Sequence, residues 1–387
     1  MSLPTILKND LATLNAYKRE CFTPNRSLPT SGVCLAVLRI GAVALGVVGA
    51  GAWFAQYNSI AKGAFGATAV LAATAFGIPR PGTPQQSPPS PEPRFTPPQE
   101  WSGEERSKLA LNTVAYINYG LYNTNGVEKH AVYFQKGNQL AARSQFIPPR
   151  KEKFSAEKNH YLMKIIVKNQ DCIEMAKEFV EEGHKTALVN FANPETPGGG
   201  FLHGSRAQEE QICFRSELAG MMHFLQNDQS RYAGLFLFKQ HFGGLIHTPE
   251  VLVFREGELK NFDLLNDPFR VGILTSAAPE CPDIVKVEDK MAYKNEKMKT
   301  WVKAAIRTQL QTAYEQGYEA IILGAFGCGV FMNPTHAVAE LYHEVLSQEF
   351  KGAFKRVGFA IIEGRRYEHN PEGNLKPFQD RFPNTTL

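Results

Sequence analysis

The stretch that most constrains this chain spans residues 191–216 and contains three consecutive glycines, Gly198, Gly199 and Gly200. The triplet follows an apolar run, 187–191, which has the length and composition of a buried strand. Glycine loses more backbone freedom on ordering than any other residue, so such a triplet is unsuited to the interior of a helix or strand. A loop without side chains can instead press its backbone against a ligand. The triplet therefore predicts a ligand-binding loop.

A helix with an acidic start is expected directly after this loop. Seven residues beyond the triplet, Gln208, Glu209 and Glu210 begin a segment whose apolar residues have helical spacing as far as Leu225. Acidic residues commonly favour the positive end of a helix dipole, which is the simplest explanation for the two glutamates. A strand, a glycine loop and an acidic helix start in this order indicate something more specific. They predict a phosphate-binding loop with a carboxylate beside it.

A second glycine-containing segment, 324–331, lies between a predicted strand and a predicted helix, and it indicates a second phosphate-binding loop. Phe331 fits stacking on a ligand ring or ribose, and the alternative is plain core packing. Cys328 invites interpretation as a nucleophile, but nothing else in the sequence requires a thiolate, and buried cysteine is commonly inert. The residues of this loop that are candidates for ligand contact are Gly327, Cys328, Gly329, Val330 and Phe331.

The chain from residue 100 to residue 387 alternates between strand and helix patterns. Such alternation predicts an α/β sheet that is covered by helices on both faces. We expect helices over 102–117, 173–182, 296–316 and 335–350, and strands over 130–134, 161–167, 186–191, 251–254, 271–274, 320–323 and 357–362.

These motifs resemble the signature of bacterial-type poly(ADP-ribose) glycohydrolases, members of the macrodomain superfamily, in which three glycines and a short spacer precede Gln-Glu-Glu. Further blocks at 106–126, 275–280, 323–334 and 354–362 stand in the order that this family shows. The resemblance implies a macrodomain, which is a mixed β-sheet sandwiched between helices with the ligand cleft at the strand ends. It implies hydrolysis of ribose–ribose bonds in poly(ADP-ribose), with release of ADP-ribose and without a cofactor.

The resemblance also implies roles for individual residues. Glu210 takes the position of the catalytic acid/base, and Glu209 that of a neighbour that orients the ribose. Asn193 takes the position of an asparagine that hydrogen-bonds the terminal ribose, although a turn beside Pro194 explains it as well. Gln208 takes the position of a polar group in contact with the ligand.

Two other residues are assigned less directly. Asp171 stands after a predicted strand, where an acidic residue contacts adenine in other macrodomains. His203, between the triplet and the predicted helix, is expected to face solvent.

Two other functions of the same fold are compatible with these residues. One is a module that binds ADP-ribose without cleaving it, and the intact Glu209 and Glu210 argue against it. The other is a hydrolase that removes ADP-ribose from a protein side chain or a nucleobase. The expected partner is accordingly poly(ADP-ribose) or an ADP-ribosylated protein.

Composition excludes several other classes of site. The net charge is only +4 and there is no long Lys/Arg cluster, which argues against duplex nucleic-acid binding. The six cysteines have neither zinc-ligand nor disulfide-framework spacing, so we expect free thiols and no metal.

The N-terminal part of the chain has a different composition. A polar segment, 1–31, precedes a hydrophobic region, 32–78, in which Arg39 and Lys62 are the charged residues. Its two apolar runs each approach the ~20 residues that a bilayer needs, so the region predicts a hairpin of two transmembrane helices. Basic residues on both flanks favour a membrane-anchored protein whose catalytic domain faces the cytosol. Two alternatives remain: helices packed in a soluble core, and a functional hairpin for which the following domain is only a scaffold. A proline-rich linker, 79–99, follows.

Overall fold

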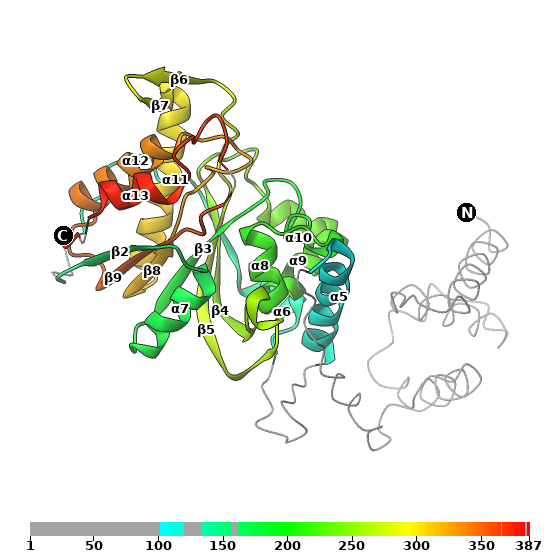
Figure 1. Ribbon diagram of the computed structural model, residues 1–387. Coiled ribbons are helices and arrows are strands. Elements are labelled where there is room, and N and C mark those ends of the chain that lie inside the picture. Colours follow the sequence, from blue (N-terminus) through cyan, green and yellow to red (C-terminus); the bar gives the residue numbers. More distant parts are fainter. Residues whose placement is uncertain (1–100, 120–133, 157–160, 365, 384) are drawn as a thin grey trace, which may run out of the picture. The chain divides into compact units, whose positions relative to one another are not determined.

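A mixed sheet of seven strands forms the centre of the structure (Figure 1). The computed structural model describes residues 101–119, 134–156, 161–364, 366–383 and 385–387. The strand order is β1-β4-β5-β3-β8-β9-β2, and β6 and β7 form a separate two-stranded sheet. The strands are β1 (Gln145–Ile147), β2 (Lys164–Lys168), β3 (Thr186–Phe191), β4 (Leu245–Arg255), β5 (Leu264–Ser276), β6 (Ile284–Val287), β7 (Lys290–Tyr293), β8 (Ala320–Leu323) and β9 (Arg356–Ala360).

The direction of the strands places both glycine loops at one edge of the sheet. Strand β3 pairs in parallel with β5 and with β8, and β8 pairs in parallel with β9. Strand β4 is antiparallel to β5, and β1 is antiparallel to β4. Because parallel strands end at the same edge, the loops after β3 and β8 emerge side by side. The glycine triplet and the 324–331 segment are those two loops.

Helices cover both faces of the sheet. The side chains of β3 alternate, so that Leu188 belongs to one core cluster while Ala187 and Val189 belong to the other. The first cluster includes residues of α5 (Gly103–Tyr119), α6 (Gly137–Arg143), α7 (Cys172–Glu181), α8 (Gln208–Arg215), α9 (Leu218–Asn227) and α10 (Gln229–Leu235). The second includes residues of α11 (Glu296–Glu315), α12 (Thr335–Gln348) and α13 (Leu375–Arg381).

The predicted α/β architecture with a mixed sheet is confirmed, and most expected elements lie where the sequence placed them. The helical segment expected from residue 208 is instead two helices, because Ser216 is extended and forms a β-bridge with Val253. That bridge is a tertiary contact without a local sequence signal. The short strand β1 was not expected, and of the strand expected over 130–134 only Phe134 is described, outside any strand.

The N-terminal predictions fall on another part of the chain. The polar segment 1–31, the hairpin predicted over 32–78 and the linker 79–99 all lie outside the described residues. Among the residues that are described, none of the helices combines the length and the apolar character that crossing a membrane requires.

Candidate active site

The backbone of the glycine triplet is shaped by the two glutamates that follow it. Gly198 and Gly199 have φ values of +74° and +57°, a region that other residues rarely adopt. A Cβ atom on Gly199 would lie 2.4 Å from Oε1 of Glu210 and 3.1 Å from Oε2 of Glu209. The loop and the start of α8 therefore touch so closely that no side chain fits between them.

Glu210 lies in the first turn of α8 beneath this loop and is only 6% exposed. Its Oε1 accepts a hydrogen bond of 2.9 Å from the backbone N–H of Gly200. Its Oε2 is buried and has no hydrogen-bond partner among the described residues. A carboxylate fixed through one oxygen, with the other oxygen unpaired, is arranged to exchange a proton with a bound molecule.

Glu209 is buried in different surroundings, at the end of β3. One of its oxygens accepts from Nδ2 of Asn190 at 3.2 Å, and the other from the backbone N–H of Asn193 at 2.8 Å. Burial raises the pKa of the Glu209 carboxyl to about 8, although both donors oppose this effect. Both Glu209 oxygens are thus held by the protein, which suits an orienting group, whereas Glu210 keeps a free oxygen.

Gln208 joins the start of α8 to the end of β3. Its Oε1 accepts from the N–H of Phe191 and its Nε2 donates to the carbonyl of Val189, both at 2.8 Å. The side chain predicted to contact the ligand therefore has its amide bonded to the strand backbone. In this position it fixes α8, and with it Glu209 and Glu210, against the central strand.

Asn193 forms the turn that its neighbour Pro194 indicated. Its Oδ1 accepts from the N–H groups of Glu195 and Thr196, each at 2.9 Å. Its Nδ2 makes no hydrogen bond within the described part of the chain, so this group is free to donate to a ligand. The sequence left two roles open for Asn193, a turn former and a hydrogen-bonding partner of the ribose. The structure is compatible with both, because the turn uses the amide oxygen and leaves the amide nitrogen for a ligand.

The second glycine loop is held by Asn333, a fully buried residue that the sequence did not single out. Its Nδ2 donates to the carbonyls of Gly327 at 3.1 Å and of Phe331 at 3.2 Å. Gly327 has φ +71°, and a Cβ atom there would lie 2.6 Å from that same Nδ2. An Asn-Pro dipeptide such as Asn333-Pro334 is typical of turns, but it does not indicate that the asparagine holds the preceding loop.

The other residues of this loop differ in exposure. Cys328 is fully buried, and burial raises the pKa of its thiol to about 12, which agrees with inert packing. Val330 is 80% exposed at the surface of the loop. Phe331 is half-buried and packs against the second core cluster. A Cβ atom on Gly329 would meet nothing within 4 Å.

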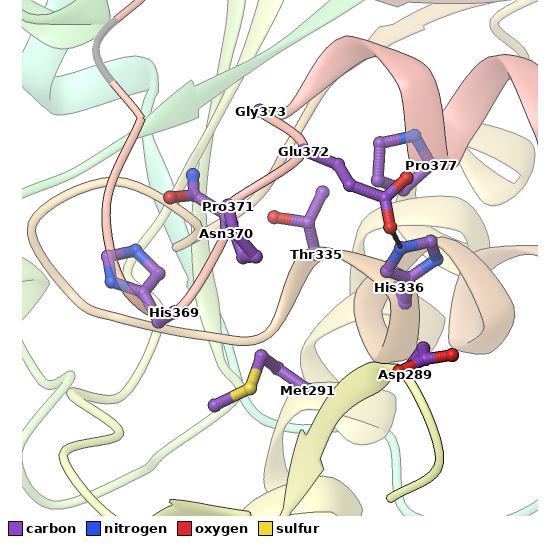
Figure 2. Close-up of a pocket in the computed structure, with 10 residues that line it drawn as sticks. All are labelled: Asp289, Met291, Thr335, His336, His369, Asn370, Pro371, Glu372, Gly373 and Pro377. Atoms are coloured by element: carbon purple, nitrogen blue, oxygen red, sulfur yellow. Dashed lines mark ion pairs between the residues drawn. The ribbon is translucent and has the colours of Figure 1, made fainter. Parts of the chain in front are cut away.

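Figure 2 shows a pocket lined by residues of the β6–β7 turn, β7, α12 and the C-terminal segment 369–377. His369 and Asn370 from this segment bond to the carbonyl of Cys328 at 2.9 Å and 3.4 Å. On its outer side His336 and Glu372 form an ion pair at 3.4 Å. The pocket contains none of the predicted site residues, and His369 and Asn370 of its lining support the second glycine loop through Cys328.

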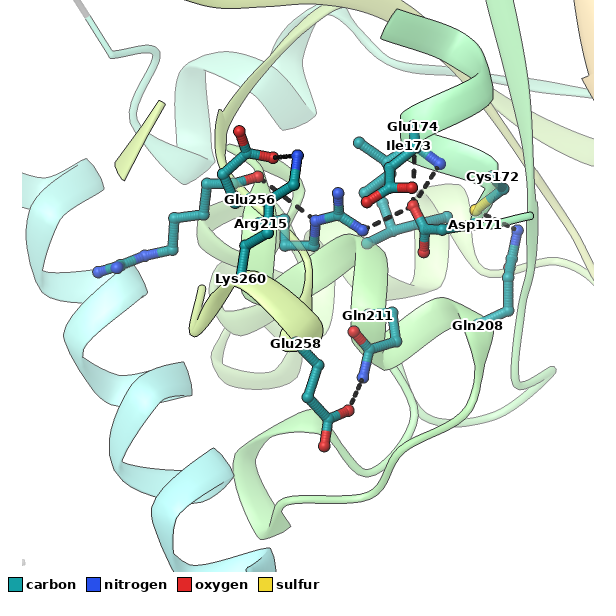
Figure 3. Close-up of polar contacts among 12 residues, drawn as sticks. Asp171, Cys172, Ile173, Glu174, Gln208, Gln211, Arg215, Glu256, Glu258 and Lys260 are labelled. Atoms are coloured by element: carbon teal, nitrogen blue, oxygen red, sulfur yellow. Dashed lines mark hydrogen bonds and ion pairs between the residues drawn. The ribbon is translucent and has the colours of Figure 1, made fainter. Parts of the chain in front are cut away.

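Asp171 connects two helices beside the site (Figure 3). As the N-cap of α7, its Oδ1 accepts from the N–H groups of Ile173 at 2.9 Å and Glu174 at 3.0 Å. The same oxygen forms an ion pair of 2.7 Å with Arg215, whose side chain is 2% exposed. The residue predicted to contact adenine thus uses one oxygen to fasten α8, and Arg215 was not predicted at all.

The two remaining expectations concern His203 and metals. His203 is exposed, as expected. Within the described ranges, no group of three or more His, Cys, Asp or Glu residues is arranged to hold a metal ion.

Comparison with known proteins shows what the chain is similar to. Residues 110–256 match the family model of the microbial-type PARG catalytic domain. This span contains β3, the glycine triplet and α8, and the second glycine loop lies beyond it. No curated protein sequence matches the chain.

Solved structures of PARG, poly(ADP-ribose) glycohydrolase, extend the similarity to most of the described chain. PARG from Thermomonospora curvata is 28% identical, with a TM-score of 0.60 over 72% of this chain and 100% of that one. Its complex with the inhibitor ADP-HPD is 27% identical, with a TM-score of 0.58 and the same coverage. PARG from Deinococcus radiodurans in complex with ADP-ribose is 25% identical, with a TM-score of 0.53 over 67% of this chain and 98% of that one.

Proposed function

We propose that this protein hydrolyses ribose–ribose glycosidic bonds in poly(ADP-ribose) and releases ADP-ribose. The observation that carries the proposal is Glu210, buried under the glycine triplet with one oxygen bonded to Gly200 and the other unpaired. The match to the microbial PARG catalytic domain and the similarity to PARG structures support the same reaction. We also propose that the mixed sheet and its helices form a macrodomain, as the motifs indicated.

In the first half of the reaction Glu210 acts as a general acid. The bond between the anomeric carbon of one ribose and the hydroxyl oxygen of the next breaks, and the proton of the Glu210 carboxyl passes to the departing oxygen. Positive charge develops on the anomeric carbon and the ring oxygen, as in other glycosidases. The substrate's own diphosphate, held by the backbone N–H groups of the two glycine loops, lies beside this charge and stabilises it.

In the second half a water molecule attacks the anomeric carbon and gives its proton to the Glu210 carboxylate. This step forms the new C–O bond and restores the acid, so one carboxyl group serves both steps. Ordinary glycosidases use a second carboxylate for part of this work. Glu209 is next in sequence, but both of its oxygens are occupied by Asn190 and Asn193. It therefore orients the ribose and the end of β3 and does not transfer the proton.

The direct test is incubation of the full chain with poly(ADP-ribose) of defined length and, separately, with a mono-ADP-ribosylated protein. We expect the polymer to shorten with release of ADP-ribose, measured by chromatography. Binding of ADP-ribose without cleavage of either substrate would show a binding module. Cleavage of the mono-ADP-ribosylated protein alone would show the second alternative, a mono-ADP-ribosyl hydrolase.

We further propose that residues 32–78 anchor the protein in a membrane, with the catalytic domain on the cytosolic side. The support is compositional: two apolar runs, one with a single charge and one with none, are flanked by basic residues. The full chain is expected to stay in the membrane fraction after extraction with alkaline carbonate. A variant lacking residues 32–78 serves as the control and should appear in the supernatant. Release of the full chain by carbonate would disprove the anchor.

A further inference from the structure

The first described helix, α5, lies against the turn that follows the glycine triplet. Nε of Arg106 donates to the carbonyl of Gly204 at 2.8 Å. Oγ of Ser107 donates to the carbonyl of Leu202 at 2.6 Å. Both carbonyls belong to the turn 201–204, almost a hundred residues further along the chain. Neither contact has a role in the chemistry proposed above.

The backbones of the helix and the turn also meet directly. Gly204 has φ +77°, and a Cβ atom on it would lie 1.9 Å from the carbonyl oxygen of Gly103. A fourth glycine in the loop region is therefore required by the approach of α5 and not by a ligand. The turn is enclosed by the helix start on this side.

Arg106 is itself held in place, which makes it a rigid support. Its Nη1 donates to the carbonyl of Trp101 at 2.5 Å and lies 3.5 Å from Oε1 of Glu258, and its side chain is 12% exposed. The other oxygen of Glu258 accepts from Arg206 at 3.0 Å and from Gln211 of α8 at 3.2 Å. Figure 3 shows the bond between Glu258 and Gln211. The Glu258 carboxylate thus connects α5 to Arg206 and Gln211, which lie on either side of Glu210 in the sequence.

Backbone hydrogen bonds connect this turn to Gly200, and Gly200 is hydrogen-bonded to the Glu210 carboxyl. The N–H groups of His203 and Ser205 donate to the carbonyl of Gly200 at 2.9 Å and 3.1 Å. The N–H of Gly200 in turn donates to Oε1 of Glu210 at 2.9 Å. A shift of the turn therefore moves the backbone of Gly200, and with it the only hydrogen bond that the described residues make to the Glu210 carboxyl.

We propose that Arg106 and Ser107 are positioning residues, which hold the turn 201–204 so that the Gly200 N–H stays directed at Glu210. This inference rests on the proposed function for its effect on the rate. Displacement of a reacting group by about 1 Å can cost up to ~10²-fold in rate. Loss of one of two supporting hydrogen bonds should cost less, about tenfold in kcat.

The test compares Ser107→Ala with Ser107→Thr, which keeps the hydroxyl group, and with Arg106→Gln. The matched control is Lys108→Ala on the same helix, because the Lys108 side chain is 71% exposed and pairs with Glu104 at the surface. For Ser107→Ala and Arg106→Gln we expect kcat for polymer cleavage to fall about tenfold while the Kd for ADP-ribose stays unchanged. Ser107→Thr should recover most of kcat, and Lys108→Ala should match the parent.

A second measurement does not depend on activity. Hydrogen exchange of the backbone amides in 198–206 should be faster in Ser107→Ala and Arg106→Gln than in the parent, and parental in Lys108→Ala. Unchanged exchange would overturn the proposal, and so would a lower melting temperature with an unchanged kcat. If the parent protein does not cleave the polymer, the proposed function fails, and the exchange measurement still decides whether α5 holds the turn.

Discussion

Glu210→Gln is expected to lower kcat for poly(ADP-ribose) cleavage by at least ~10² to 10⁴, the usual contribution of general acid/base catalysis. The loss falls at the upper end or beyond it, because this one carboxyl serves both the departure of the ribosyl oxygen and the attack of water. The Kd for ADP-ribose should stay close to that of the parent, since the diphosphate is held by backbone N–H groups of the two glycine loops.

The structure explains why this variant should fold. Gln has nearly the shape of Glu, and its side-chain oxygen can accept the bond from the N–H of Gly200, now 2.9 Å long. Its NH₂ group would take the place of Oε2, which has no partner among the described residues and therefore opposes no donor. Neither the triplet nor the start of α8 needs to move.

Glu209→Gln is the informative comparison. Both Glu209 oxygens accept from donors, Asn190 Nδ2 and the Asn193 N–H. A Gln at this position must turn its NH₂ group toward one of them, so this variant should lose stability and ligand binding as well as rate. Calorimetry with ADP-ribose, a polymer-cleavage assay and a melting curve on the same preparations separate the two patterns. If Glu210→Gln retained more than about a tenth of the parent rate, Glu210 would not be the acid.

The sequence predicted that the glycine triplet and the two glutamates lie together, but it did not predict the contacts of single side chains around them. The triplet and its distance to Glu209 and Glu210 are local features, so the contact between the Gly199 backbone and the two carboxyls could be anticipated. Spacing along the chain places Gln208 near a ligand but does not show which group its amide meets. In the fold that amide meets the backbone of β3.

Contacts between residues that lie far apart in the sequence could not be found from the sequence. Glu258 contacts Arg106 across 152 positions, and Asp171 contacts Arg215 across 44. The glycines of the second loop could be recognised in the sequence, but the burial of Asn333, which holds that loop, could not. Each is a polar side chain whose partner is brought to it by the tertiary fold and not by a nearby stretch of sequence.

Gly199→Ala is expected to remove most of the catalytic activity, by ~10²-fold or more. Two effects combine at this position. The φ of +57° strains any residue with a Cβ by roughly 1–2 kcal/mol. The added methyl group would also lie 2.4 Å from Oε1 of Glu210, so either the loop or the carboxyl must move. The same displacement breaks the hydrogen bond from Gly200 that orients the acid.

Gly183→Ala separates these two effects. Gly183 follows α7 with φ +86°, and a Cβ atom there would meet nothing within 4 Å. It therefore carries the backbone strain without the collision, so both variants should melt at lower temperatures than the parent, and Gly199→Ala by the larger amount. Polymer cleavage should survive in Gly183→Ala and be lost in Gly199→Ala. If the two variants cleaved the polymer equally well at a temperature where both are folded, the absence of a side chain at Gly199 would not matter to Glu210. The positive φ values alone would then explain why glycine is required in the triplet.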